Sequence, residues 1–431
     1  MSYNPTHSDI QTTLDGTKLI ENWDFAKADT KYFTHGLHDY PARMIPQIAK
    51  RLIEKYSSVK STILDPFCGS GTTLVEAMLS QRNAIGNDVN PLALLLSKVK
   101  STPINFLKSQ FDLPTFLNKL ENDHKKVKQQ KKLKDPSIDL PNLFHWFKPE
   151  AVFDLEFLYQ KIKKTTDDDV KDFLNVVLSN TIFKSSNIDH HSSRFIRVLH
   201  EPELKKFKPN VLKNFRKKLI EATNSMNAFF NAVDSQSRKY PKITLNKGDA
   251  RKLSFPNESV DTIITSPPYG EEKNTLGYVR WAKLSIAWLR LNGNESKITE
   301  KQSLGSQYSK DLRRDLDLLP SQTAKNLLEP LMESEAKRVA DALPFFLDYL
   351  DSLKEMYRIL KTNSFCCIVI GDRSIRKIPL DMEKVTLELA DNVGFNHEMS
   401  FFRKLPMKLI PWITPTGKTI SSESIIILKK G

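Results

Sequence analysis

Two apolar runs, each ending in an aspartate and followed by a helical pattern, dominate the first hundred residues. The first ends at Asp65 and leads through a turn with two glycines into a helix expected from Thr72. The second covers Asn83–Asp88, and a helix is expected from Pro91 because proline suits the first turn of a helix. Strands that alternate with helices form a parallel sheet covered on both faces. The sequence therefore predicts an α/β fold.

The alternation stops after residue 103 and returns at residue 241. Residues 104–240 have the apolar spacing of helices and are interpreted as an inserted helical domain between residues 1–103 and 241–431, the two halves of the sheet domain. Residues 291–345 are polar and form a possible second excursion. A helix contains Trp281, and another lies near Phe346–Leu360. The remaining strands are expected at Ile243–Ala250, Val260–Ser266, Phe365–Ile370, Phe395–Arg403 and Ser424–Lys429.

The charge balance favours a polyanionic partner. The 431 residues include 65 Lys and Arg against 51 Asp and Glu, a formal net charge of +14, which suits nucleic acid. No run approaches the roughly 20 apolar residues of a membrane helix, and the polar start lacks a secretory signal pattern. Three cysteines, two of them adjacent, make a disulfide framework unfavourable. Membrane and secreted proteins are therefore disfavoured, and a cytoplasmic location is expected.

The glycine turn indicates a ligand site. Gly69 and Gly71 let the backbone turn sharply and approach a ligand, and the following helix offers unpaired N–H groups. A phosphate loop is disfavoured because Trp412 stands where the Gly417–Thr419 segment needs an earlier glycine. A dinucleotide fold is disfavoured because Leu74 replaces the third glycine of that motif.

Aspartates follow three successive predicted strands. Asp65, Asp88 and Asp249 all stand at the carboxyl ends, where open α/β sheets bind ligands. Asp88 could accept hydrogen bonds from both hydroxyls of a ribose, and Asp249 could accept one from an adenine amino group. One such aspartate is more often a helix cap or a solvated turn. Three in succession favour a nucleoside-type ligand.

The segment Thr265–Gly270 follows a buried strand and carries two prolines and a tyrosine. The prolines prevent the sheet from continuing and leave their carbonyls free, while Tyr269 offers a flat face. Alone, this would be an ordinary proline turn with a packing tyrosine. Beside the glycine turn and the acidic strand ends, it suits a planar base with an exocyclic amine.

Together, Asp65–Thr73 and Ser266–Tyr269 resemble the cofactor loop and the catalytic motif of S-adenosylmethionine-dependent amino-methyltransferases that act on DNA bases. The resemblance covers roughly residues 32–103 and 241–431. It implies a Rossmann-like, seven-stranded mixed sheet of the class I methyltransferase type, with its last two strands forming a hairpin. Tyr32–Ile53 resembles the family's extra segment near the methionine end of the cofactor.

By this resemblance the cofactor is S-adenosylmethionine and no metal is needed. The residues expected to bind it are Asp65, Pro66, Phe67, Cys68, Gly69, Gly71, Thr72, Thr73, Asp88, Asp249 and Ala250. The expected catalytic residues are Ser266, Pro267, Pro268 and Tyr269. The target amine would donate to the Ser266 hydroxyl and the Pro267 carbonyl, and positioning would then suffice for direct transfer. Tyr269 would stack on a base extruded from the duplex.

Three methyltransferase activities remain open. Ser266 is typical of the cytosine-N4 enzymes of the family, so methylation of cytosine N4 in double-stranded DNA is favoured. The resemblance also implies a bacterial, nucleoid-associated enzyme of a restriction–modification system, with a possible cognate endonuclease. Adenine-N6 enzymes and tRNA guanine-N2 enzymes with a DPPYG motif are the alternatives. A cytosine-C5 enzyme is disfavoured because Cys68 and Cys366 each follow a phenylalanine instead of proline. A DNA-binding protein without activity would leave the cofactor loop unexplained.

The insert 104–240 is the first candidate for target recognition, and residues 291–345 are the second. A basic stretch in the insert is expected to contact phosphates through Lys205, Lys206, Lys208, Lys213 and Arg216. Phe207 and Phe215 are expected to add apolar anchors there. Asp189-His190-His191 lacks partner ligands at metal-site spacing and is interpreted as a surface or polar-network segment.

Overall fold

The computed structural model describes residues 10–12, 18–41, 43–130, 136, 138–189, 198–236, 239–271, 278–291, 302–405, 413–414, 417–418 and 422–431. Within this part of the chain, no helix is long and apolar enough to cross a membrane.

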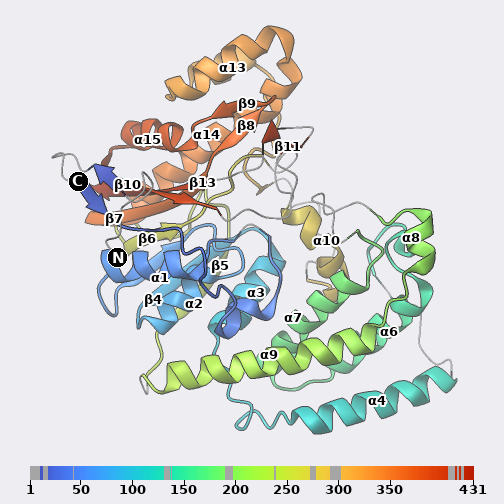
Figure 1. Cartoon of the computed structure of the whole chain (residues 1–431). Helices are drawn as coiled ribbons and strands as arrows, with labels where there is room; N and C mark the ends of the chain where they lie inside the picture. Colours follow the sequence, from blue (N-terminus) through green and yellow to red (C-terminus); the bar gives the residue numbers. More distant parts are fainter. Residues whose placement is uncertain are drawn as a thin grey trace, which may run out of the picture.

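A seven-stranded sheet forms the centre of the molecule (Figure 1), in the order β10-β13-β7-β6-β3-β4-β5. β13 runs antiparallel to both of its neighbours, and the other strand pairs are parallel, which confirms the predicted mixed sheet and the pairing of the last two strands. The strands are β3 (Thr62–Asp65), β4 (Asn83–Asp88), β5 (Ile243–Lys247), β6 (Val260–Thr265), β7 (Leu360–Gly371), β10 (Phe395–Lys404) and β13 (Ser422–Lys430).

Successive side chains of a strand point to opposite faces of the sheet, and both sets are apolar here. Helices therefore cover both faces. On one face, Ile264 and Cys367 pack with α1 (Pro46–Tyr56) and α2 (Thr72–Leu79). On the other, Ile263 and Cys366 pack with α14 (Ala336–Ile359) and α15 (Met382–Val393). Both cysteines are fully buried, which confirms that the pair belongs to the core.

The described part of residues 104–240 is largely helical. Its longer helices share one apolar cluster with α3 (Pro91–Ser101), which follows β4, and with α10 (Tyr278–Leu289), which follows β6. The helices are α4 (Leu113–Gln130), α5 (Leu143–Trp146), α6 (Pro149–Lys163), α7 (Asp168–Ser185), α8 (Glu201–Lys206) and α9 (Val211–Asp234). The insert therefore packs against one helix that precedes it in the sequence, α3, and one that follows it, α10.

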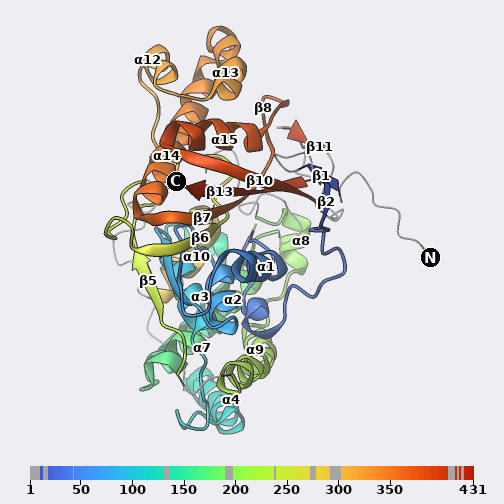
Figure 2. The same cartoon turned by 90° about the vertical axis from the view of Figure 1, so that its left-hand side faces the viewer.

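The second excursion is more ordered than its polar sequence indicates. Residues 302–345 include α12 (Leu312–Asp317), α13 (Gln322–Ser334) and the first part of α14, while residues 292–301 lie outside the described part. α14 begins ten residues before the expected Phe346 and runs through Pro344, because Val339, Ala342 and Leu343 bury their side chains on the same core. Figure 2 places α12 and α13 at the opposite end of the molecule from α4 and α9.

Two strands differ most from their expected bounds. β7 begins at Leu360, five residues before the expected Phe365. β5 ends at Lys247, so Asp249 lies just beyond the strand and does not end it. The remaining elements are β1 (Ile10–Thr12), β2 (Lys18–Ile20), the 3-10 helix η1 (Phe33–Leu37), β8 (Arg373–Ile375), β9 (Ile378–Leu380), β11 (Ile413–Thr414) and β12 (Gly417–Lys418).

Candidate active site

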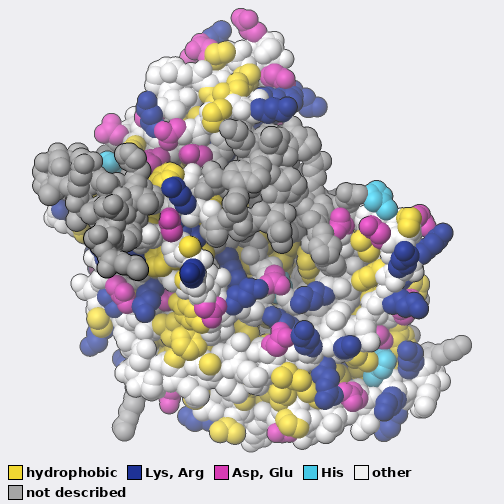
Figure 3. Space-filling view, in the orientation of Figure 1, with side chains coloured by type: hydrophobic (Ala, Val, Ile, Leu, Met, Phe, Trp, Pro, Cys, Tyr) yellow, Lys and Arg dark blue, Asp and Glu magenta, His cyan; other side chains and the backbone are white. Residues whose placement is uncertain are grey.

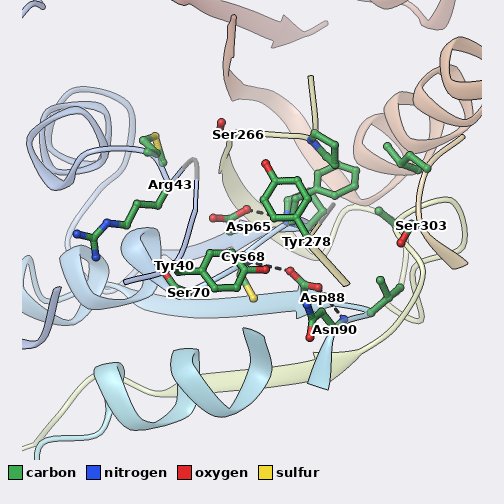
Figure 4. Close-up of a pocket in the computed structure, with 18 of the residues that line it drawn as sticks. Tyr40, Arg43, Asp65, Cys68, Ser70, Asp88, Asn90, Ser266, Tyr278 and Ser303 are labelled. Atoms are coloured by element: carbon green, nitrogen blue, oxygen red, sulfur yellow. Dashed lines mark hydrogen bonds between the residues drawn. The ribbon is translucent and has the colours of Figure 1, made fainter. Parts of the chain in front are cut away.

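The order in which the chain adds strands to the sheet reverses between the neighbouring strands β3 and β6. From β3 the chain continues outward to β4 and β5, and from β6 it continues to β7 on the other side. Ligands of such sheets bind beyond the carboxyl ends of the strands at this switch point. A cavity with about 1000 Å³ of empty space, part of it open to solvent, lies there (Figure 4).

Most residues predicted for the cofactor and the target line this cavity. They are Asp65, Pro66, Phe67, Cys68, Gly69, Thr72, Thr73, Asp88, Asp249, Ala250, Ser266 and Pro268. Gly71, Pro267 and Tyr269 are not part of the lining. The structure therefore brings the glycine turn, the acidic strand ends and the proline turn to one cavity, although almost 200 residues separate the first from the last.

Asp65 ties three elements together at the base of the cavity. Its carboxylate accepts hydrogen bonds from the hydroxyls of Thr73 in α2 and Thr265 in β6, each at 2.7 Å, and from the backbone N–H of Phe67 at 3.1 Å. The side chain is almost completely buried, and burial raises its pKa to about 6. Asp65 thus holds the glycine turn against the β6 tip.

The two glycines of the turn have different roles. Gly69 has φ +48°, lines the cavity, and a Cβ there would meet the ring of Tyr40 at an ordinary 3.5 Å. Gly71 has φ +83°, and a Cβ there would come within 2.8 Å of the Ser97 Cα in α3. The close approach at Gly71 is therefore to a helix, whereas Gly69 brings the backbone to the cavity.

Asp88 orients the cavity end of β4. Its two carboxylate oxygens accept the backbone N–H groups of Gly69 at 2.9 Å and Asn90 at 2.8 Å. Burial raises the pKa of Asp88 to about 6. The remaining lone pairs of this carboxylate are the acceptors that two ribose hydroxyls would need, which fits the predicted role.

Asp249 is held by a neighbouring cation. Arg251 donates to both carboxylate oxygens of Asp249, at 2.6 Å from Nη2 and 3.0 Å from Nε, and also to Asp348 of α14 at 2.8 Å. Asp348 in turn accepts the backbone N–H of Gly305 at 2.8 Å. This network connects the segment after β5 with residues 302–304, which line the same cavity.

Several lining residues were not predicted individually. Tyr40, Arg43 and Met44 come from the segment before α1, which the family resemblance had placed near the cofactor without singling them out. Tyr278 of α10 stacks against Tyr40, with ring centroids 6.1 Å apart and planes 24° apart. No sequence signal indicated Tyr278 or residues 302–304. The other unpredicted lining residues are Ser70, Val89, Asn90, Gly248 and Gly270.

The electrostatics of the cavity suit a cationic nucleoside. Asp65, Asp88 and Asp249 supply three acidic residues to the lining, and Arg43 is the basic residue among those that line it. Arg43 donates to the backbone carbonyl of His35, and Figure 4 shows its guanidinium turned away from Asp65 and Asp88. The buried Ser70 hydroxyl also lines the cavity and lacks a hydrogen-bond partner among the described residues. The carboxylates accept hydrogen bonds and carry negative charge, so the cavity fits a ligand that has hydroxyls and a positive charge.

The proline turn contributes Ser266, Pro268 and Gly270 to the cavity wall. Ser266 lies at the end of β6, and its hydroxyl is 3.3 Å from the phenolic oxygen of Tyr269. Tyr269 is half-buried, packs beside the core cluster under α14, and donates to Glu423 of β13 at 3.0 Å. Glu423 was not anticipated from the sequence, because it lies 154 residues further along the chain.

The residues expected at DNA lie on the surface of the insert, with one exception. Those in α8, α9 and the turn between them are exposed, namely Lys205, Lys206, Lys208, Lys213 and Arg216. Lys205 pairs with Glu201 at 3.4 Å, and Arg216 pairs with Glu121. The expectation that Phe215 anchors DNA is wrong, because its ring is fully buried in the core of the insert.

The described residues contain no group of three or more His, Cys, Asp and Glu that could hold a metal ion. His190 and His191 lie outside the described residues. Cys68 lines the cavity wall as a buried thiol, 3.7 Å from the Ser97 hydroxyl, and burial raises its pKa well above the usual range. A buried, neutral thiol does not serve as a nucleophile.

Comparison with known proteins identifies the family. The family model N6_N4_Mtase, described as DNA methylase, matches residues 5–98. The Type II methyltransferase M.MvaI of Kocuria varians is 32% identical over 426 residues, covering 94% of this chain and 93% of its own length. M.MjaII of Methanocaldococcus jannaschii, also a Type II methyltransferase, is 24% identical and covers 59% of this chain and 63% of its own length.

Among solved structures, a S-adenosylmethionine-dependent methyltransferase from Methanosarcina mazei overlaps 88% of this chain and 96% of its own, with 10% identity and a TM-score of 0.32. The similarity to M.MvaI, in contrast, runs through nearly the whole of both chains. The chain belongs to the N4/N6 family of S-adenosylmethionine-dependent DNA methyltransferases.

Proposed function

We propose that this protein methylates the N4 amine of cytosine in double-stranded DNA, as the modification enzyme of a restriction–modification system. The observation that carries the proposal is the position of Ser266 on the wall of the cavity that also holds Gly69 and Asp88. Serine at the first position of this motif is typical of the cytosine-N4 branch of the family. The Type II designation of the relatives supports the restriction–modification context.

When bound, S-adenosylmethionine supplies a methyl group on a positively charged sulfur. The residues of the chain hold it and orient the acceptor. Asp88 accepts from the ribose, Phe67 and Ala250 line the wall, and the carboxylates favour the cation. The Ser266 hydroxyl and the Pro267 carbonyl accept hydrogen bonds from the target amine and hold its lone pair toward the cofactor.

The target base must leave the duplex to reach this cavity, because its amine is otherwise inaccessible. We infer that Tyr269 packs against the extruded base. The hydrogen bond from its phenol to Glu423 fixes the ring between Pro268 and Gly270 in the chain, both of which line the cavity. The stacked pair of Tyr40 and Tyr278 lines the cavity and offers further aromatic surface.

The insert of residues 104–240 is our candidate for target recognition. Figure 3 shows Lys and Arg side chains along the right-hand side of this face, in the region where Figure 1 places α8. Residues 302–345, with α12 and α13, are the second candidate. The two segments extend from the sheet domain in opposite directions (Figure 2), so DNA bound over the cavity could reach both.

The deciding experiment is identification of the methylated nucleoside. The protein is incubated with tritiated S-adenosylmethionine and unmethylated double-stranded DNA, with tRNA in a parallel reaction, and the nucleosides are separated after digestion. We expect label in N4-methylcytosine from DNA. Label in N6-methyladenine would transfer the protein to the adenine branch, and label only in tRNA would overturn the proposal.

Ser266→Ala separates catalysis from binding in the same assay. Loss of the hydroxyl removes an acceptor for the target amine, so we expect transfer to fall by about 100-fold, the scale measured for other single preorganised hydrogen-bonding groups. The affinity for S-adenosylmethionine, measured by calorimetry, should persist. Loss of cofactor binding together with activity would count against the catalytic placement of Ser266.

A further inference from the structure

A chain of hydrogen bonds connects the proline turn with β10, a strand at the edge of the sheet. The Ser266 hydroxyl lies 3.3 Å from the Tyr269 phenol, which donates to Oε1 of Glu423 at 3.0 Å. Arg403 Nη1 of β10 donates to Oε2 of the same carboxylate at 2.6 Å. Arg403 lies in β10 and Glu423 in β13, whereas the proline turn follows β6. In the sheet, β7 stands between β13 and β6 (Figure 2).

The chain is well shielded from water at its charged end. The side chain of Arg403 is 6% exposed and that of Glu423 is 14% exposed. Burial, and next the Glu423 carboxylate, raise the pKa of Tyr269 well above its usual range, so the phenol keeps its proton. In such surroundings, ionic hydrogen bonds are strong and the orientation of their protons is firmly set.

The chemistry of the four groups allows one direction of donation. A guanidinium only donates and a carboxylate only accepts, so Arg403 and Tyr269 both donate to Glu423. The single proton of the phenol is then used, and its oxygen can only accept from Ser266. The proton of the serine hydroxyl points away from the target, and the lone pairs of Oγ remain for a donor in the cavity.

We propose that Glu423 and Arg403 are positioning residues that make the Ser266 hydroxyl a hydrogen-bond acceptor for the target amine. The inference depends on the proposed function of Ser266 and extends it to two residues of β13 and β10. A serine hydroxyl that is free to rotate can present its proton instead, and an exocyclic amine with two N–H donors would then be repelled. Glu423 prevents this rotation: it accepts the Tyr269 proton, so that the phenol oxygen accepts the proton of Ser266.

Glu423→Gln tests the direction directly, because it changes one atom and nearly preserves the shape. Arg403 can only donate, so the amide oxygen of the glutamine faces Arg403 and its NH₂ group faces Tyr269. The phenol must then donate to Ser266, and the serine proton turns toward the target. We expect kcat to fall by about tenfold or more. The KM for DNA and the affinity for S-adenosylmethionine should stay unchanged.

Tyr269→Phe completes a double-mutant cycle. It interrupts the chain between Ser266 and Glu423, so adding E423Q to Y269F should cause no further loss of kcat. A merely structural role of Glu423 would give additive losses. Additive losses, or a kcat of E423Q equal to that of the unchanged protein, would overturn the proposal.

Glu383→Gln is the matched control. Glu383 of α15 is half-buried and accepts a hydrogen bond from Ser424, the residue beside Glu423, at 2.7 Å. Among the described residues, it makes no hydrogen bond or ion pair with Ser266, Tyr269 or Glu423. We expect E383Q to retain full kcat. If E423Q does not fold, Y269F carries the test: unchanged kcat in Y269F would overturn the proposal, because Ser266 would not need the phenol.

The outcome is distinguishable from failure of the proposed function. The cycle is scored with whichever DNA base the unchanged protein methylates, so identification of adenine as the target would leave it intact. Absence of any DNA methylation by the unchanged protein would remove the proposed function itself. Methylation that is insensitive to E423Q would remove only the positioning role.

Discussion

At the scale of single residues, two buried carboxylates contribute charge to the cavity at the carboxyl ends of the strands. Asp65 and Asp88 both have a pKa raised to about 6, against 3.8 for an unperturbed aspartate, because burial disfavours the ionised form. Each nevertheless accepts several hydrogen bonds from the protein, which keeps its position independent of the ligand. Their charge, however, depends on pH near neutrality.

This predicts that the affinity for S-adenosylmethionine falls as the pH drops through 6. Above that pH both carboxylates are ionised and attract the cation, and below it both gain protons. We expect the dissociation constant to rise roughly tenfold between about pH 8 and about pH 5 for each carboxylate that must be ionised. Calorimetric titration across this range measures it, and a constant affinity would contradict the role of the two charges.

Unfolding separates this effect from loss of structure. Because the folded-state pKa of each aspartate lies above the unfolded value of 3.8, the folded protein binds more protons between about pH 6 and about pH 4. These two groups therefore add stability as the pH falls through that interval. Loss of cofactor binding near pH 5 should not be accompanied by a lower Tm from this source.

Asp88→Ala tests the ribose contact at constant pH. The change removes the acceptors for the cofactor and the two hydrogen bonds that orient Gly69 and Asn90, so we expect at least about tenfold weaker binding of S-adenosylmethionine. Asp112→Ala is the control, since Asp112 is exposed, caps a helix through the Thr115 N–H, and is absent from the cavity wall. Equal binding by both variants would refute the role of Asp88.

At the scale of elements, the turn between β3 and α2 depends on two glycines in the left-handed region, for different reasons. An alanine at either position would adopt a φ that costs about 1–2 kcal/mol. At Gly71 the added Cβ would also come within 2.8 Å of the Ser97 backbone in α3, whereas at Gly69 its nearest neighbour is a ring atom at 3.5 Å. The packing of α2 on α3 thus constrains Gly71 more strongly.

We therefore predict that Gly71→Ala lowers the Tm more than Gly69→Ala. Gly69→Ala serves as the matched control, because it carries the same kind of backbone strain without the helix clash. The free energy of unfolding should fall by about 1–2 kcal/mol for G69A and by more for G71A. Equal stability of the two variants would show that α3 moves aside easily.

The sequence predicted most elements around the site, and the exceptions have physical causes. The strands β3, β4 and β6 and the helices α2, α3 and α10 are where their apolar spacing and turn residues indicated. α14 is longer than expected at its N-terminal end, because proline inside a sequence usually ends a helix. Here the burial of the turns before Pro344 outweighs the backbone hydrogen bond that proline cannot donate. The interruption of β5 before Asp249 left no signal in the apolar pattern.

At the scale of the whole molecule, binding of DNA should depend on salt through the basic surface of the insert. Neutralising Lys205, Lys206 and Lys208 removes three exposed charges on or next to α8. If all three contact phosphates, the slope of log affinity against log salt should become shallower by roughly 3. An unaltered slope would remove this stretch from the interface.

A matched triple variant tests whether position matters or merely net charge. Lys60, Lys242 and Lys361 are exposed and precede or begin β3, β5 and β7, at the sheet edge opposite to the cavity. Replacing these three changes the net charge by the same amount. We expect the slope to stay nearly the same in this control, whereas an equal change in both variants would indicate a diffuse charge effect.

What the sequence determined by itself is local. A strand that ends in Asp65, a turn that needs glycine, a helix start and a rigid proline turn are each specified within about ten residues, because propensity and φ requirements act over that range. These local signals predicted the α/β class, the ligand site at the glycine turn and Ser266 as a candidate catalytic residue. The family comparison then identified the chemistry.

What only the tertiary structure decided is which distant groups meet at the strand tips. The pairing of β13 with β7 and β10 delivers Glu423 and Arg403 to Tyr269, and the packing of α10 brings Tyr278 to Tyr40. Arg251 engages Asp249 because α14 contributes Asp348 to the same network. Such contacts follow from sheet order and from the need to pair buried polar groups, and neither is encoded in any short stretch of the chain.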